Sequence, residues 1–287
     1  MIFAMPELPE VEYIARQLQS ALIGRTITRA EVRWPRAITT PDPVEFAACL
    51  TVRAGRRIAR IGRRGKYLLL GLDGDETLIA HRRMSGNLTL LAPGAEAAYT
   101  RVTFTLDDGR TLAFSDPRKF GRLALVAEVD LPAFFAALGP EPLEPDFTPA
   151  ALAARLAGRA RALKALLLDQ SVVVGLGNIY ADEALYAARL HPLRAGNSLT
   201  AAEIAALHGA IQSVLRAGIA HGGTTFGRHR DIYDEAGTNL DYLQVYRRTG
   251  APCHRCGTPI TRIVVTQRGT HFCPHCQTLP PAAAASP

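Results

Sequence analysis

Four cysteines near the end of the chain constrain its fold more than any other feature. Two residues separate Cys253 from Cys256 and Cys273 from Cys276, and sixteen residues lie between the two pairs. In each pair this spacing lets both sulfurs turn toward one ion, and thiolates suit the borderline softness of zinc. Because four thiolates close a tetrahedral coordination sphere, the sequence predicts one structural Zn²⁺ with no open position.

Two disulfides are the alternative for these cysteines. The first residues lack a cationic segment followed by an apolar core and a cleavage site, so we expect a reducing compartment in which thiols persist. Between the pairs, Ile260 to Thr266 is rich in β-branched residues and Gln267 to Thr270 predicts a turn. The zinc is therefore expected to hold a two-stranded hairpin with Arg268 at its tip. The fifth cysteine, Cys49, is expected to be a small buried hydrophobe.

A proline close to the start of the chain, Pro6, is a candidate nucleophile. At an amino terminus it carries a secondary amine, and an α-amino group with a pKa of about 7.7–8.0 is unprotonated in roughly 10–20% of molecules at pH 7. Attack of this amine on C1′ of a sugar gives a cationic iminium, which is an electron sink for breaking further bonds. In the alternative, Pro6 and Pro9 only mark the start of a helix, because proline suits the first helical turn.

The residues ahead of Met5 bear directly on this chemistry. If Met1 to Ala4 stay attached, the Pro6 nitrogen is a tertiary amide that has neither a proton nor a basic lone pair. The working chain is therefore expected to begin at Met5, and Met5 is expected to be removed.

The charge balance favours a polyanionic partner. The chain has 33 Lys and Arg against 26 Asp and Glu, a formal net charge of +7. Seven of the basic residues lie between Arg53 and Lys66, although a solvated strand face also explains such a run. With 287 residues and 48% hydrophobic content, two to three domains are expected. No stretch of eighteen apolar residues exists, so we expect a soluble cytoplasmic protein without a membrane partner.

The first half of the chain changes from helical to strand patterning. Residues 6–24 predict a helix, because Val11, Ile14, Leu18 and Leu22 recur at helical spacing. From Ile27 to Val129, short β-type runs alternate with Gly and Asp and predict a β-sandwich or a barrel. The clearest runs are Tyr67–Leu72, Thr77–Ala80, Leu88–Leu91, Val102–Leu106, Thr111–Phe114 and Leu123–Val126.

The second half predicts helices. The Pro-rich residues 138–143 mark a boundary, and residues 148–219 then show Ala- and Leu-rich helical periodicity. Glycines in residues 174–180 allow a tight turn before Asn178, which is expected to cap the next helix. A helix amino terminus exposed in this way is a phosphate site, and simple capping is the alternative.

Several motifs in order resemble bacterial formamidopyrimidine-DNA glycosylase, whose family removes oxidised purines from DNA. The resemblance covers nearly the whole chain. Its motifs are Met-Pro-Glu-Leu-Pro-Glu-Val-Glu at 5–12, Gly-Lys-Tyr-Leu-Leu at 65–69, Met-Ser-Gly at 84–86, Asp-Pro-Arg-Lys-Phe-Gly at 116–121, Leu-Gly-Pro-Glu-Pro-Leu at 138–143, Val-Gly-Leu-Gly-Asn-Ile-Tyr at 174–180, Gly-Gly-Thr-Thr at 222–225 and the zinc hairpin.

The resemblance implies an α+β multidomain fold. It comprises an N-terminal helix with a catalytic β-sandwich domain at 6–139, and a helix-two-turn-helix DNA-binding domain with the lesion-recognition loop at 140–240. A zinc-finger hairpin at 241–279 and a disordered tail at 280–287 complete the chain. The implied protein acts as a monomer in the bacterial cytoplasm on double-stranded DNA that contains a damaged base.

The resemblance also implies a bifunctional reaction, base excision followed by strand cleavage at the abasic site through β,δ-elimination. Pro6 attacks C1′ of the damaged nucleotide, and Glu7 donates and shuttles protons. Lys66 resembles the lysine of the phosphate and β-elimination step, and Arg268 the arginine that assists δ-elimination. The lesion base must leave the stack, and the charges that develop in the reaction need a carboxylic acid and fixed cations nearby.

The remaining implied residues contact DNA. Met84, Arg118 and Phe120 match a triad that fills the space of the flipped base, a use of apolar wedges that offsets unstacking. Although a single Met and Phe are more often core residues, the surrounding motifs favour this role. The residues that resemble phosphate and backbone contacts are Arg101, Arg118, Lys119, Arg159, Arg161, Lys164, Asn178 and Arg268.

Some residues depart from the family pattern. Arg82 stands where an apolar residue is common, Arg101 stands where a histidine is common, and residues 226–239 do not match the lesion-recognition loop closely. One alternative is therefore an endonuclease VIII-like glycosylase for oxidised pyrimidines, although Leu8 and Val11-Glu12 favour the purine branch. The other is a noncatalytic zinc-containing DNA-binding protein whose terminal amine is blocked.

Overall fold

The computed structural model describes residues 5–51, 55–226 and 230–279, and it divides the chain into two compact units. The sheet unit comprises Met1–Ala136 and Gly218–Leu240, and the helical unit comprises Ala137–Ala217 and Asp241–Pro287. Arg53, Met1 to Ala4 and the expected tail 280–287 lie outside the described residues. The finer three-part division with boundaries at 139 and 240 stays a prediction.

One nine-stranded sheet builds the first unit, with the strand order β2-β9-β5-β4-β3-β1-β7-β8-β6. All neighbours are antiparallel except β2 and β9, and only two residue pairs join β1 to β3. Because β2 and β6 form its edges, the described strands make no closed barrel. The strands are β1 Thr26–Val32, β2 Ile38–Thr40, β3 Arg56–Arg64, β4 Tyr67–Leu72, β5 Glu76–His81, β6 Asn87–Leu91, β7 Thr100–Leu106, β8 Thr111–Ser115 and β9 Arg122–Ala127.

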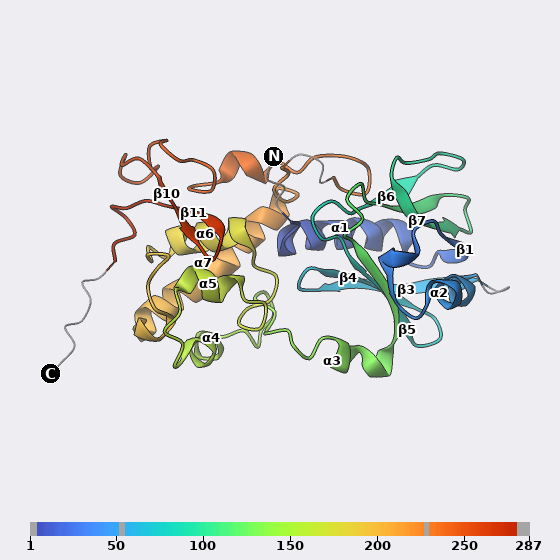
Figure 1. The fold of residues 1–287 in the computed structure, drawn as a ribbon, viewed down its shortest axis with the longest axis horizontal. Helices are drawn as coiled ribbons and strands as arrows, with labels where there is room; N and C mark the ends of the chain where they lie inside the picture. Colours follow the sequence, from blue (N-terminus) through green and yellow to red (C-terminus); the bar gives the residue numbers. More distant parts are fainter. Residues whose placement is uncertain (1–4, 52–54, 227–229, 280–287) are drawn as a thin grey trace. The chain divides into compact units, whose positions relative to one another are not determined.

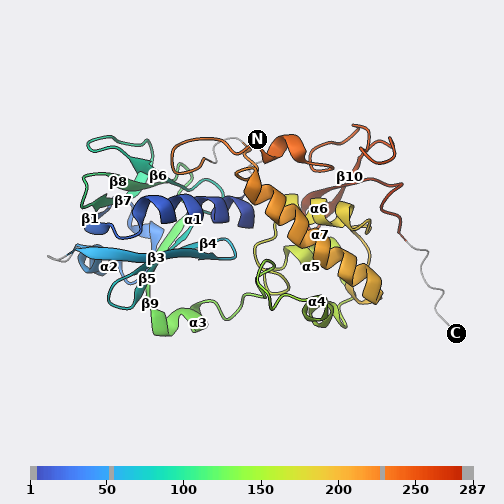
Figure 2. The same ribbon diagram turned by 180° about the vertical axis from the view of Figure 1, so that it is seen from behind.

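The helix α1, Leu8–Leu22, lies along this sheet (Figures 1 and 2). Its buried residues include Val11, Ile14, Leu18 and Leu22, as their helical spacing predicted. They join one core with side chains from both halves of the sheet and from α2, Pro43–Leu50, which agrees with the expected sandwich-type domain. A short helix at Pro35–Ala37 connects β1 to β2, and two more, Glu128–Asp130 and Leu131–Phe134 (α3), follow β9.

All six predicted runs correspond to strands, with boundaries within two residues. The basic run before them is largely β3, and ion pairs offset part of its charge. Arg56 pairs with Asp73 and Glu76, Arg60 pairs with Glu128, and Arg63 pairs with Glu12 at 2.8 Å. Several arginines of this run therefore neutralise carboxylates within the sheet unit.

The helical unit contains α4 Pro149–Leu156, α5 Leu163–Leu168 and α6 Asn178–Ala187, most of α7 Ala201–Ala220, and the hairpin strands β10 Thr261–Val265 and β11 Arg268–Phe272. Short helical turns lie at Gly196–Ser198 and Asn239–Tyr242. The buried Glu183 on α6 accepts hydrogen bonds from the amides of Gln244, Val245 and Tyr246 at 2.8–2.9 Å. This carboxylate fixes the chain just before the cysteine region. Across the described part of the chain, no helix is both long and apolar enough to span a membrane.

Candidate functional site

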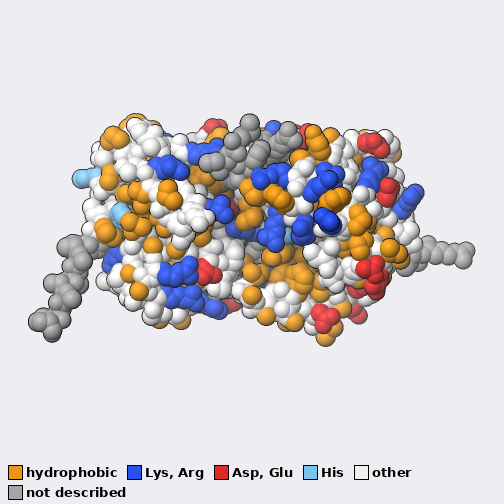
Figure 3. All heavy atoms as spheres, in the orientation of Figure 1, with side chains coloured by type: hydrophobic (Ala, Val, Ile, Leu, Met, Phe, Trp, Pro, Cys, Tyr) orange, Lys and Arg blue, Asp and Glu red, His pale blue; other side chains and the backbone are white. Residues whose placement is uncertain are grey.

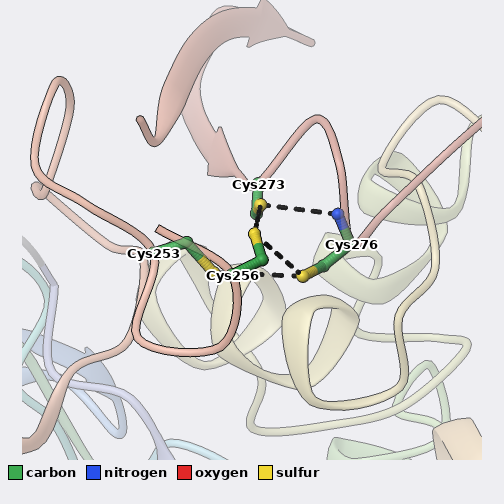
Figure 4. Close-up of side chains that lie close together, drawn as sticks. All are labelled: Cys253, Cys256, Cys273 and Cys276. Carbon is green, nitrogen blue, oxygen red and sulfur yellow. Dashed lines mark hydrogen bonds between the residues drawn. The ribbon is translucent and has the colours of Figure 1, made fainter. Parts of the chain in front are cut away.

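The four cysteine sulfurs of the helical unit converge on one point (Figure 4). Their Sγ atoms all lie within 4.8 Å of one another, and three measured separations are 3.5, 3.5 and 3.9 Å. A tetrahedral ion with bonds of about 2.3 Å to sulfur places the ligands about 3.8 Å apart. The donor set therefore fits one zinc ion, and the thiols are free rather than paired in disulfides.

Polar groups favour the thiolate of Cys253 and Cys256, whereas burial and the neighbouring sulfurs raise the pKa of Cys273 and Cys276. Although burial raises the pKa of Cys253, hydrogen bonds from the Tyr186 hydroxyl and the Arg255 amide lower it to about 6. The amide of Cys276 donates to the sulfur of Cys273 at 3.4 Å. Such contacts orient ligands and stabilise their charged form. With four protein ligands and no vacant position, this is a structural metal site.

The hairpin that joins the cysteine pairs has a shorter turn than predicted, which begins one residue earlier and ends three residues earlier. Thr266 and Gln267 form the turn with φ values of 45° and 60°, whereas Gln267 to Thr270 was expected. Two consecutive left-handed residues give a two-residue turn that matches the twist of the strands. Arg268 is consequently the exposed first residue of β11 rather than the tip, and it pairs with Val265 in register.

A buried charge network holds this hairpin to α5 and α6. Lys164 and Asp182 are both 0% exposed, and Lys164 Nζ donates to Asp182 Oδ1 at 2.6 Å and to the Asn178 carbonyl at 2.8 Å. The other Asp182 oxygen accepts the His271 amide at 2.8 Å and lies 3.1 Å from its Nδ1. Lys164 stays a predicted phosphate contact, but its ammonium also positions the start of α6.

Asn178 is the first residue of α6, not its cap as predicted, because Gly177 occupies the N-cap position. The Asn178 side-chain amide donates to the Gly269 carbonyl at 2.9 Å. Gly269 follows Arg268, so the structure brings these two predicted DNA contacts together within the helical unit. Arg159 and Arg161 flank Asp169 at 4.0 and 3.2 Å and remain partly exposed.

Loss of the Lys164 charge should destabilise the protein strongly. In Lys164→Met the buried Asp182 loses the cation of its ion pair and keeps the His271 contacts, and removal of one member of a buried pair typically costs about 3–5 kcal/mol. Chemical denaturation should show this loss, and Arg161→Met, whose ion pair is more than half exposed on the arginine side, should cost about 0–1 kcal/mol. Equal midpoints for the two variants would contradict the role of the network.

In the sheet unit, Pro6 and Glu7 precede α1 and are both buried. Glu7 is the N-cap of α1. Its side chain accepts the Glu10 amide, and the Glu10 carboxylate accepts the Glu7 amide at 2.7 Å, which forms a reciprocal capping box. The second Glu10 oxygen accepts the Thr224 amide at 2.6 Å. The predicted nucleophile and proton donor are thus neighbours on a fixed helix start.

The contact between α1 and residues 222–225 explains a glycine of that motif. Gly223 has a φ of +83°, and a Cβ there would lie 2.7 Å from the Glu10 Cγ. Only glycine combines this backbone conformation with so close an approach. Residues 222–225 are therefore fixed against the start of α1.

Lys66 lies in the two-residue turn between β3 and β4 and is buried. Its ammonium acts on nearby His81. Burial, assisted by the charges of Arg83 and Lys66, lowers the pKa of His81 to about 3. Because His81 is neutral at pH 7, Lys66 faces no additional cation from this ring.

One carboxylate joins the turns that carry Met84, Arg118 and Phe120. Asp116 is buried, and its Oδ1 accepts the Ser85 hydroxyl at 2.5 Å and the Arg118 amide at 3.1 Å. The Arg118 guanidinium carbon lies 4.8 Å from the centroid of the Phe120 ring, and Phe120 is 44% exposed. These contacts bring the two parts of the predicted wedge together and leave an aromatic ring at the surface.

The neighbouring predicted contacts support the same turn. Lys119 has a φ of +62°, and its Nζ lies 4.0 Å from the centroid of the Trp34 ring. Arg101 Nε donates to the Asp116 carbonyl at 2.8 Å, so this arginine, present where a histidine was expected, ties the turn to β7. Figure 3 shows further Lys and Arg side chains gathered on one face of the sheet unit, a surface that suits a polyanion.

Sequence reasoning missed the buried carboxylates that organise these parts, namely Glu10, Asp116, Asp182 and Glu183. They lie in or near the quoted motifs, so their positions were visible. Their roles were not, because each accepts hydrogen bonds from groups distant in sequence, such as the Thr224 amide on Glu10. A carboxylic acid among apolar residues is the one signal that could have marked them.

Three family models match the chain. They are the formamidopyrimidine-DNA glycosylase N-terminal domain at residues 5–123, the H2TH domain of the same enzyme at 138–229, and a zinc finger found in FPG and IleRS at 250–279. A formamidopyrimidine-DNA glycosylase of Chloroflexus aggregans is 53% identical over 277 residues, 96% of this chain and 99% of the relative.

Two solved structures are also similar. The MutM (Fpg) protein of Thermus thermophilus has a TM-score of 0.85 and 42% identity, and the match covers 96% of this chain and all of that one. A complex between the Lactococcus lactis Fpg and DNA containing an abasic site has a TM-score of 0.88 and 36% identity, with 95% and 100% coverage.

Proposed function

This chain belongs to the formamidopyrimidine-DNA glycosylase family, and we propose that it excises oxidised purines from DNA through a covalent bond between the Pro6 nitrogen and C1′ of the damaged nucleotide. It is a DNA-repair glycosylase with lyase activity at abasic sites. The observation that carries the catalytic assignment is the fixed, buried start of α1, where Pro6 adjoins Glu7. The family match begins at Met5, one residue before the proposed nucleophile.

The excision step follows from the chemistry of a secondary amine. The Pro6 nitrogen bonds to C1′ while the glycosidic bond breaks, and the leaving base accepts a proton. Glu7 is the proposed proton donor. A carboxyl beside the amine is suited to this task because it can then pass the amine proton to O4′ as the C1′–O4′ bond breaks, which opens the sugar and gives the iminium.

The strand-cleavage step uses the electron sink of the iminium. Loss of a proton from C2′ lets the C3′–O bond break, which releases the 3′ phosphate in β-elimination, and a second elimination breaks the bond to the 5′ phosphate. We assign Lys66 to the phosphate and first elimination, and Arg268 to the second. Both side chains are basic, and a positive charge at these positions can stabilise the negative charge that develops on the phosphates.

The partner is double-stranded DNA with a damaged base. The wedge of Met84, Arg118 and Phe120 fills the space left by the flipped nucleotide, and the exposed Phe120 supports this assignment. Arg101, Lys119, Arg159, Arg161, Lys164 and Asn178 are proposed to hold the backbone, directly or through the turns that they fix. A bacterial cytoplasmic location is proposed from the substrate and the bacterial relatives.

Excision of 8-oxoguanine opposite cytosine should exceed excision of thymine glycol. The purine preference follows from the family, and an endonuclease VIII-like enzyme would give the reverse order. Single-turnover assays on duplexes that differ only in the lesion measure both rates, and an abasic duplex of the same sequence controls for binding and strand cleavage. Faster release of thymine glycol would refute the proposed substrate class.

A further inference from the structure

Arg82 is a fully buried arginine between the Met84 turn and the segment that begins at Arg230. It is 2% exposed, and its guanidinium donates three hydrogen bonds. Nε donates to the Gly86 carbonyl at 2.8 Å, and Nη2 donates to the Asn87 Oδ1 at 2.5 Å and to the Arg230 carbonyl at 3.0 Å. The last bond joins residues 148 positions apart in the sequence.

The first of these bonds closes the turn that carries Met84. The Gly86 amide also donates to the Arg82 carbonyl at 2.9 Å, so residues 82 and 86 are joined twice. A Cβ on Gly86 would lie 2.6 Å from that carbonyl oxygen, which shows how tightly the turn is closed. The Met84 backbone is therefore fixed by the side chain of Arg82.

The bond to the Arg230 carbonyl reaches a segment that is itself well anchored. Asp231 Oδ2 accepts the Gln17 side chain at 2.7 Å, and its Oδ1 accepts the amides of Tyr233 and Glu235. The Leu90 amide donates to the next carbonyl, that of Ile232, at 2.8 Å. Arg82 thus binds a part of the segment that several hydrogen bonds hold in place, so a shift of the segment would move the Met84 turn as well.

Two carboxylates make this buried cation tolerable. Burial lowers the pKa of Arg82 to about 10, and the charges of Glu10 and Asp231 oppose that lowering. Arg82 therefore stays protonated at neutral pH. Glu10 is the residue that closes the capping box of α1 with Glu7, so the same charge cluster extends to the proposed catalytic helix start.

We propose that Arg82 is a positioning residue that couples the Met84 turn to the Arg230–Asn239 segment, which belongs to the lesion-recognition loop implied by the family resemblance, so that wedge insertion and contact with the lesion base occur in one fixed geometry. The inference rests on the proposed function and deepens it. Its consequence is selective, because excision needs the wedge and the base-contacting segment in one register, whereas a preformed abasic site offers that segment no base to contact.

Arg82→Met tests this coupling, since methionine keeps an unbranched side chain and removes all donors. In protein that begins at Pro6, excision of 8-oxoguanine should fall by about 100-fold, the effect of misplacing a reacting group by about 1 Å. Cleavage of a preformed abasic duplex should change by less than about threefold, within the small effects typical of uncoupled sites. Arg82→Lys should recover part of the loss because it restores one charged donor.

Arg16→Met is the matched control, because it removes an arginine of the same unit that is 59% exposed and forms a surface ion pair with Glu12 at 2.7 Å. It should leave the ratio of excision to abasic cleavage unchanged. An equal loss of both activities in Arg82→Met, or no loss, would overturn the proposal. If the Met variant does not fold, the ratio for Arg82→Lys decides, and a ratio equal to that of the unaltered protein overturns it.

Hydrogen exchange separates this proposal from the proposed function. In Arg82→Met the amides of residues 230–239 should exchange faster than in Arg16→Met, whatever the enzyme does to DNA. Identical exchange rates in the two variants would contradict the proposed link between Arg82 and this segment. If the unaltered protein neither excises 8-oxoguanine nor cleaves an abasic site, the proposed function fails, and the catalytic part of this inference fails with it. The exchange rates still test whether Arg82 holds residues 230–239.

Discussion

Protein that begins at Pro6 should be trapped on 8-oxoguanine DNA by borohydride, whereas protein that retains residues 1–5 should not. In the first form the Pro6 nitrogen is a secondary amine with a pKa of about 7.7–8.0, so an appreciable fraction is free at pH 7. In the second form it is an amide with no basic lone pair. We expect the covalent yield and the strand cleavage to differ by about 10³-fold or more, the order of loss when a nucleophile is removed.

Gel separation of the reduced protein–DNA adduct measures this result, and mass spectrometry of the adduct locates the bond. Lys66 is the main competitor as the trapped amine, so Lys66→Ala in the form that begins at Pro6 is the matched control and should still be trapped at Pro6. Loss of trapping in Lys66→Ala alone, or equal trapping of the blocked form, would contradict the assignment. Natively expressed protein that retains residues 1–5 and binds damaged duplex without cleaving it would instead support the noncatalytic alternative.

The sequence predicted the fold well wherever local pattern decides it. The spacing of Val11, Ile14, Leu18 and Leu22 predicted the buried face of α1, and the paired cysteines predicted the convergent sulfurs. The hairpin was also expected, but its turn was placed wrongly. Two non-glycine residues with positive φ, Thr266 and Gln267, form the turn, and β-branched Thr266 is not a residue that marks such a turn in a sequence.

The sequence predicted which residues form the candidate site, but it did not predict their hydrogen-bond partners. Pattern alone could not show that Arg82 reaches the Arg230 carbonyl or that Asp182 binds the His271 amide, because these partners are distant in sequence. Asn178 illustrates the same limit. Its residue type suggested a cap, yet Gly177 occupies that position and the asparagine amide is used on the hairpin instead.

Removal of zinc should unfold the hairpin and weaken binding to damaged duplex. Within the described part of the chain, the hairpin's buried cluster consists of Tyr186, Val245, Ile260 and two of the cysteines, with Cys276 packed against it. Such a small core cannot replace a metal whose binding supplies about 10–16 kcal/mol in zinc fingers. Because Arg268 is carried by β11, its charge-assisted contact to phosphate is lost, which at about 1.5–3 kcal/mol corresponds to roughly 10- to 100-fold in affinity.

Fluorescence anisotropy with a labelled abasic duplex measures the affinity, and elemental analysis confirms that the metal has left. Cys256→Ser should reproduce the chelated protein, while Cys49→Ser should retain both metal and affinity because Cys49 packs against the core of the sheet unit. Adding Zn²⁺ back should restore binding to the chelated protein but not to Cys256→Ser. Unchanged affinity in metal-free protein would mean that Arg268 keeps its position without the ion, and the structural role assigned to the four thiolates would be wrong.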